Sequence, residues 1–130
     1  MRDFLFMTRE EFEKLVAEAF DGLPARIREK IENVALIVED SPTLEQIKKG
    51  NIGKDGLLLG LYEGVPQTRR GLGYNLVLPD KITIFQKPIE QIAHTPKEIQ
   101  DQVRNTVWHE AAHYFGFDDE EIKKLGRKSR

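Results

Sequence analysis

Two histidines near the C-terminal end of the chain, His109 and His113, stand four residues apart. On an α-helix this spacing places their side chains about 40° apart around the axis and one turn apart along it. Both imidazoles can then reach one ion at about 2.0–2.1 Å, as zinc requires. Glu110 lies one step further round the helix, which suits a general base that takes a proton from metal-bound water. These three residues predict a helical zinc site with hydrolytic chemistry.

A third metal ligand has to come from beyond the helix that carries the histidines. On a straight helix Asp119 would lie about 15 Å from His109, too far to share an ion. Gly116 lets the chain turn, because glycine adopts the left-handed conformation that closes a helix, and Asp119 follows three residues later. A carboxylate oxygen is a good zinc ligand, and two histidines, a carboxylate and a water make an open, catalytic type of site. Asp118 is the alternative ligand, and His94 is the next candidate.

Five further side chains have both a functional and a structural interpretation. Tyr62 and Tyr74 could stabilise an oxyanion, but they also fit amphipathic residues at strand ends. Arg69 and Arg70 could bind a substrate carboxylate or phosphate, but they also fit a solvated loop. Trp108 points about 100° away from the first histidine of the pair, which favours packing. The structural interpretation is preferred for all five.

The two histidines belong to the clearest predicted helix, residues 95–115. Thr95 is a capping residue, Pro96 takes the first helical position, and Glu98 completes a capping box. Gly116 ends the helix. Apolar residues recur at four-residue steps and form a core-facing stripe, Ile99, Val103, Val107 and Ala111. The histidines flank this stripe, which is where the edge of a cleft would lie.

Shorter helices are predicted in the rest of the chain. An amphipathic helix covers residues 8–20, starting with a Thr8–Glu11 capping box. A second helix runs from Pro24 to about residue 30, and a helical turn starts at residues 41–42. Asp118 or Asp119 can open a last helix, which would extend from residue 120 to about residue 126.

The strands predict a small sheet. Residues 33–39 are rich in Val, Ile and Leu, so we expect a strand that is buried on both faces. Residues 57–62 form a second strand, followed by a loop over residues 64–73. Residues 74–78 and 81–86 are either a pair of strands or one strand after an extended lead-in. No internal repeat interrupts this order.

The composition is that of one globular domain over residues 1–130, with 39% apolar and 32% charged residues. Cysteine is absent, which excludes a disulfide scaffold and a thiolate metal site. Neither a membrane span nor a signal segment is evident, so we expect a cytoplasmic protein. The net charge of −2 disfavours a nucleic-acid partner, although residues 121–130 carry a net charge of +4 that could contact an anionic partner.

The segment from His109 to Asp119 has the pattern H-E-x-x-H-x-x-G-x-x-D. It resembles the minimal zincin-like metallopeptidase family, which consists of small bacterial single-domain proteins. The likeness also covers four other stretches, residues 9–12, 33–40, 59–64 and 103–110. The resemblance implies that His109, His113 and Asp119 are zinc ligands and that Glu110 is the catalytic acid–base. The only methionines are Met1 and Met7, so the methionine turn of larger zincins cannot follow the motif.

The fold that the resemblance implies is an α/β (α+β) zincin-like domain, in which a small mixed sheet packs on the active-site helix. An edge strand of that sheet would bind an extended peptide by strand addition. We therefore expect a monomeric zinc metallopeptidase that acts on peptides or proteins, with no nucleic-acid or membrane partner. The alternative is a catalytically silent, metal-stabilised binding module. Hydrolysis of RNA is a third, weaker hypothesis.

Overall fold

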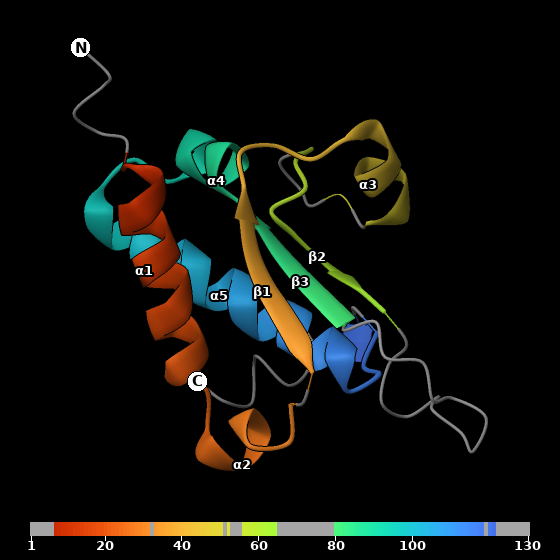
Figure 1. The fold of residues 1–130 in the computed structure, drawn as a ribbon. Coiled ribbons are helices and arrows are strands. Elements are labelled where there is room, and N and C mark those ends of the chain that lie inside the picture. The colour runs from red at the N-terminus through yellow and green to blue at the C-terminus, as the bar shows by residue number, and fades with distance from the viewer. Residues whose placement is uncertain are drawn as a thin grey trace.

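The computed structural model describes residues 7–31, 33–50, 52, 56–64, 80–118 and 120–121 (Figure 1). These residues form an α+β fold with a three-stranded mixed sheet, which confirms the expected fold class. The elements follow one another as α1 Arg9–Asp21, α2 Ala25–Arg28, β1 Val34–Glu39, α3 Leu44–Lys49, β2 Gly60–Glu63, β3 Asp80–Phe85, α4 Gln86–Ile92 and α5 Pro96–Tyr114. Among the described residues, none of the helices combines the length and the apolar character that crossing a membrane requires.

The sheet has the strand order β1-β3-β2. β3 is central, pairing in parallel with β1 and antiparallel with β2. The prediction that residues 33–39 are buried on both faces is wrong, because only Val38 in β1 is buried and β1 lies at an edge of the sheet that the described residues form. The strand that the core covers most completely is β3, in which Ile82 and Ile84 are fully buried.

The core lies between the sheet and the two long helices. In Figure 1, α5 crosses behind the strands and α1 stands beside β1. The predicted stripe of α5 is buried at all four positions. Three of its residues belong to one core cluster with Phe12 and Val16 of α1 and with Ile82 and Ile84 of β3, namely Ile99, Val103 and Val107. This packing fixes α5, and with it the histidines, against one face of the sheet.

Side-chain caps determine where the helices begin. The Thr8–Glu11 capping box of α1 forms as predicted, and Gly22 ends that helix. At α5 the Thr95 hydroxyl accepts from the backbone N–H of Glu98, but the Glu98 carboxylate accepts from the N–H of His94 rather than from that of Thr95. The second half of the predicted capping box is therefore displaced by one residue.

Two elements differ from the sequence-based expectation. The strand expected over residues 57–62 begins only at Gly60. Helix α4 has no counterpart among the predicted helices; its Pro88 lies in the first turn, where the missing N–H costs no intrahelical hydrogen bond. Residues 65–79, which include the strand expected at 74–78, lie outside the described residues, as do residues 122–126 of the last predicted helix.

Helix α3 starts at Leu44, two residues after the predicted helical turn, and Thr43 caps it. Lys49 at its end donates a hydrogen bond of 2.9 Å to Glu63 of β2. This hydrogen bond and the charge of Glu63 raise the pKa of Lys49. The contact ties α3 to the end of the edge strand.

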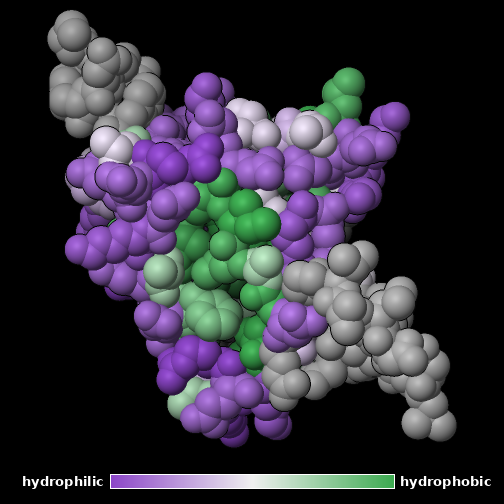
Figure 2. Space-filling view, viewed as in Figure 1, coloured by the Kyte–Doolittle hydropathy of each residue, from purple (hydrophilic) through white to green (hydrophobic). Residues whose placement is uncertain are grey.

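An apolar hollow opens between α1 and β1 on the face seen in Figure 2. Its walls include Val16 and Ala17 of α1 and residues 36–38 of β1. Arg9 spans one end of the hollow: its guanidinium donates to the Val38 carbonyl oxygen at 2.9 Å and pairs with the Asp40 carboxylate at 3.1 Å. The outer edge of β1 is thus capped by a charged side chain at this end.

Candidate metal centre

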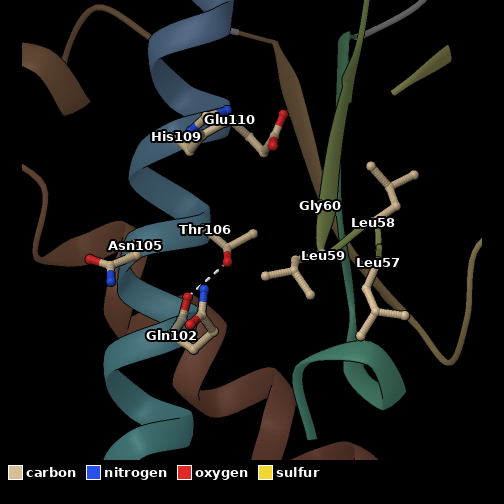
Figure 3. A pocket seen from close by; sticks show the side chains of 9 residues that line it. All are labelled: Leu57, Leu58, Leu59, Gly60, Gln102, Asn105, Thr106, His109 and Glu110. Atoms are coloured by element: carbon tan, nitrogen blue, oxygen red, sulfur yellow. Dashed lines mark hydrogen bonds between the residues drawn. The ribbon is translucent and has the colours of Figure 1, made fainter. Parts of the chain in front are cut away.

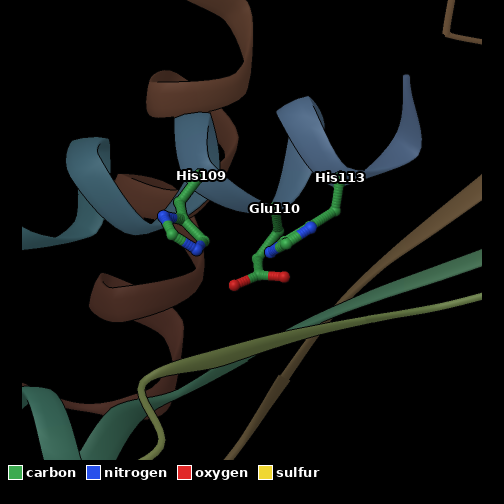
Figure 4. Close-up of side chains that lie close together, drawn as sticks. All are labelled: His109, Glu110 and His113. Atoms are coloured by element: carbon green, nitrogen blue, oxygen red, sulfur yellow. The ribbon is translucent and has the colours of Figure 1, made fainter. Parts of the chain in front are cut away.

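Helix α5 brings the predicted His–Glu–His group together on one side of its axis (Figure 4). One potential ligand atom from each of His109, Glu110 and His113 lies within 4.8 Å of the other two. The imidazole centroids are 4.9 Å apart, with an angle of 71° between the ring planes. Both histidines are half-buried, whereas Glu110 is only 6% exposed. The group is therefore compact and reachable from one side.

The C-terminal end of α5 closes in a left-handed turn at Gly116, as the sequence predicts. Gly116 has a φ of 90°, a conformation that favours glycine. Its N–H donates to the His113 carbonyl oxygen at 2.9 Å, and the N–H of Phe117 donates to the Ala112 carbonyl oxygen at 3.2 Å. These two bonds are the Schellman pattern, which satisfies the last carbonyl groups of the helix.

The same turn positions a backbone acceptor for one of the histidines. The Phe117 carbonyl oxygen lies 3.1 Å from Nδ1 of His113. A carbonyl oxygen can only accept, so this contact is a hydrogen bond in the tautomer that carries the proton on Nδ1, and that tautomer leaves Nε2 available for a metal. Metal-binding histidines are commonly oriented by such a second bond. The only sequence signal for this contact is the glycine that forms the turn.

We predict that Gly116→Val weakens metal binding although it removes no candidate ligand. A β-branched side chain at this φ costs about 1 kcal/mol or more, so the turn opens and the Phe117 carbonyl leaves Nδ1 of His113. Titration with zinc by calorimetry measures the loss of affinity. Gly116→Asn is the matched variant, because asparagine tolerates the left-handed conformation, and it should retain most of the affinity. Equal affinity for Gly116→Val and wild type would contradict this role of the turn.

The acidic residues after Gly116 are described only in part. The Asp118 carboxylate accepts from the backbone N–H of Glu121 at 2.8 Å, and the Glu121 carboxylate accepts from the N–H of Asp118 at 2.9 Å. This reciprocal pair is a capping box, so of the two predicted openings of the last helix Asp118 takes the capping role. Asp119 lies outside the described residues, and its role as a ligand stays a prediction.

The remaining candidates from the sequence lie away from the histidines or outside the described residues. The Tyr62 hydroxyl donates to buried Asp80 at 2.8 Å, and the Tyr62 ring meets Tyr114 edge-on, with centroids 6.1 Å apart, which fits its structural interpretation. His94 is exposed and is not part of the His–Glu–His group. Trp108 is half-buried. Tyr74, Arg69 and Arg70 lie outside the described residues.

A glycine of β2 allows the sheet to approach helix α5 closely. A Cβ atom on Gly60 would lie 2.6 Å from Cγ2 of Thr106 and 3.2 Å from Cγ of Glu110. Real Cβ atoms are essentially never 2.6 Å from another heavy atom, so only glycine fits here without movement. Glu110 is thus enclosed between α5 and β2, with its side chain held against the strand. Sequence reasoning did not identify this role of Gly60.

We predict that Gly60→Ala lowers the free energy of unfolding by about 1–3 kcal/mol, the usual cost of overpacking. Urea denaturation measures this change. Adding Thr106→Ser removes the clashing Cγ2 and should restore most of the loss, while the hydroxyl can still donate to the Gln102 carbonyl oxygen. Gly22→Ala is a control, because there a Cβ would make only ordinary contacts at 3.4 Å and beyond. An unchanged stability of Gly60→Ala would show that β2 is not held this closely.

A groove of about 200 Å³ opens beside this group, between the segment that leads into β2 and the N-terminal side of the metal site on α5 (Figure 3). We call it the leucine–amide groove. Its lining residues are Leu57, Leu58, Leu59, Gly60, Gln102, Asn105, Thr106, His109 and Glu110. Because the groove ends at His109 and Glu110, a molecule bound in it would lie next to the candidate metal centre.

Comparison with known families gives a match over most of the chain. A family model described as zincin-like metallopeptidase matches residues 31–128. The chain belongs to the zincin-like metallopeptidase family. Membership in this family implies a metal ion, typically zinc, and the His–Glu–His group of this zincin-like chain is a possible place for it. No curated protein matches the chain.

A solved structure also resembles this zincin-like chain in fold. It is a conserved hypothetical protein from Thermo thermophilus, with a TM-score of 0.52 and 21% sequence identity. The match covers 93% of this chain and 99% of the other. At this identity the likeness concerns the fold alone.

Proposed function

We propose that this protein is a zinc-dependent peptidase in which His109, His113 and Asp119 bind the metal and Glu110 acts as acid–base. The observation that carries the proposal is the grouping of donor atoms from His109, Glu110 and His113 within 4.8 Å, next to β2, which lies at an edge of the sheet in the described part of the chain. Two imidazoles and a carboxylate are a donor set that suits zinc. When bound, zinc lowers the pKa of a water molecule and polarises a peptide carbonyl group.

Glu110 is placed to move the proton in this reaction. Its side chain is buried between α5 and β2, yet one carboxylate oxygen lies within 4.8 Å of a ring nitrogen of each histidine, and Glu110 lines the leucine–amide groove. It would accept a proton from the attacking water and deliver it to the leaving amine. A carboxylate held in this way needs little reorganisation between the two transfers.

The substrate is proposed to be a peptide or protein that adds to the outer edge of β2. The N–H of Phe85 donates to the Leu59 carbonyl oxygen, so these two residues form a hydrogen-bonded pair. Hydrogen-bonded and non-bonded pairs alternate in an antiparallel ladder, and the register continues with Gly60 opposite Ile84. The backbone N–H and C=O of Gly60 and Tyr62 therefore point away from β3. An extended peptide could pair there, directly beside Glu110.

Two measurements test this proposal on the full-length protein. Metal analysis should find close to one zinc per chain, and digestion of a peptide library should be abolished by a chelator and restored by zinc. We further expect the active species to be a monomer without a nucleic-acid or membrane partner. If the protein binds zinc and loses thermal stability on chelation but cuts no peptide at any pH, it is a metal-stabilised binding module instead.

A further inference from the structure

We propose that the leucine–amide groove is a specificity subsite that accepts one uncharged side chain of the peptide, next to the bond that is cut. This inference rests on the proposed peptidase function and adds the substrate class to it. It concerns residues of the groove to which no catalytic or metal-binding role has been assigned, chiefly Leu59, Gln102 and Asn105.

The position of the groove puts it beside the reacting bond. It shares His109 and Glu110 with the candidate metal centre and extends from them toward Gln102, away from His113. Its opposite wall is the segment from Leu57 to Gly60, which continues directly into the edge strand (Figure 3). A peptide that pairs with Gly60 would therefore pass the mouth of the groove, and the side chain nearest the cut bond would point into it.

The lining of the groove favours an uncharged side chain. One wall consists of leucines, and the other carries the neutral amides of Gln102 and Asn105. The Thr106 hydroxyl donates to the Gln102 carbonyl oxygen at 2.8 Å, so its proton is already used. Among the described lining residues, Glu110 has the only carboxylate, and the proposed reaction uses it. Apart from this carboxylate, the described lining offers a charged side chain no opposite charge to offset the loss of its water.

The charged residues nearest along α5 do not change this chemistry. Asp101 pairs with Lys97 at 2.9 Å and lies 3.9 Å from Arg104. None of these three residues lines the groove. They contact one another outside it, so they supply no partner for a charged side chain within it.

The size of the groove limits what it can hold. Ligand pockets for whole small molecules usually have about 300–1,000 Å³, whereas this groove has about 200 Å³. Gly60 contributes no side chain, and Thr106 and Glu110 pack against it and close the wall. The space fits a single side chain of medium size, either aliphatic or amide. We expect preference for residues such as leucine, methionine and glutamine over lysine, arginine, aspartate and glutamate.

The experiment exchanges amides for carboxylates of the same shape. The double variant Gln102→Glu, Asn105→Asp adds two negative charges to the groove, and Gln100→Glu is the matched control, because residue 100 lies on α5 but does not line the groove. Wild type and variants are assayed on peptides that differ only at one position flanking the cut bond. Binding of the same peptides is measured separately by fluorescence anisotropy. The protein in that assay is zinc-loaded Glu110→Gln, with and without the Gln102→Glu and Asn105→Asp changes. This second measurement does not depend on peptide cleavage.

Wild type should prefer uncharged residues over lysine by about 10-fold or more at one flanking position, and the double variant should remove or reverse that preference. Gln100→Glu should behave as wild type. The subsite is overturned if the double variant keeps the wild-type preference in binding, or if Glu110→Gln protein binds none of the peptides. If wild type cuts nothing while the binding preference appears and responds to the groove variant, the peptidase function fails and the subsite stands.

Discussion

Replacing Glu110 with glutamine is expected to lower peptide hydrolysis by about 10²–10⁴-fold while the protein keeps its zinc. Glutamine has the shape of glutamate, so the tight contact with Gly60 is preserved, but the amide cannot accept and release the proton. Steady-state kinetics on a cleaved library peptide measure the activity, and atomic absorption measures the metal. The thermal unfolding midpoint should change little.

His109→Ala separates this effect from loss of the metal. It should lower both zinc content and activity, because it removes an imidazole from the group on α5. The proton-transfer role of Glu110 is refuted if Glu110→Gln turns over peptides as fast as wild type. If Glu110→Gln loses its zinc together with its activity, the carboxylate acts as a ligand rather than as the acid–base.

Removing the carboxylate of Asp119 should weaken zinc binding by more than the 10–100-fold that is typical of residues outside the ligand set. The change deletes a proposed ligand and also a negative charge opposite a divalent ion. Asp118→Ala is the control one residue away. It should have little effect on the metal, because the Asp118 carboxylate is already used in the capping pair with Glu121. Calorimetric titration of both variants with zinc gives the two affinities.

The zinc affinities of the Asp118→Ala and Asp119→Ala variants identify the third ligand. If Asp118→Ala loses the metal and Asp119→Ala keeps it, the assignment is wrong by one residue. If neither variant changes zinc affinity, the third ligand comes from elsewhere, and the same titration on His94→Ala tests the next candidate. Thermal unfolding of each apo-protein shows whether a variant has lost its fold rather than a ligand.

Helix α5 could be predicted from the sequence because its signals are local. The capping Thr95, the four-residue apolar steps and the closing Gly116 each act within a few positions, and all three appear in the structure. The approach of His109 to His113 follows from helical spacing alone. Periodicity and capping therefore account for the two histidines and Glu110.

The features that the sequence did not predict depend on tertiary contacts. An apolar run such as residues 34–38 is compatible with a central or an edge strand, and only the pairing of the sheet decides between them. The need for glycine at position 60 arises because Thr106 and Glu110, far along the chain, pack against it. The leucine–amide groove likewise combines two segments that are more than forty residues apart.

The two edges of the sheet have opposite consequences for self-association. Exposed strand edges are templates on which further strands, including those of identical molecules, can assemble into polymers. On β1, the Arg9 guanidinium donates a partly buried hydrogen bond to the Val38 carbonyl oxygen. This hydrogen bond would have to break before a strand of another molecule could pair with β1 at that residue. A peptide that joins at β2 presents a new outer edge of its own on that side of the sheet. At the Val38 end of β1, by contrast, a joining strand first has to displace the arginine, so the two sides of the sheet differ in how readily they add a strand.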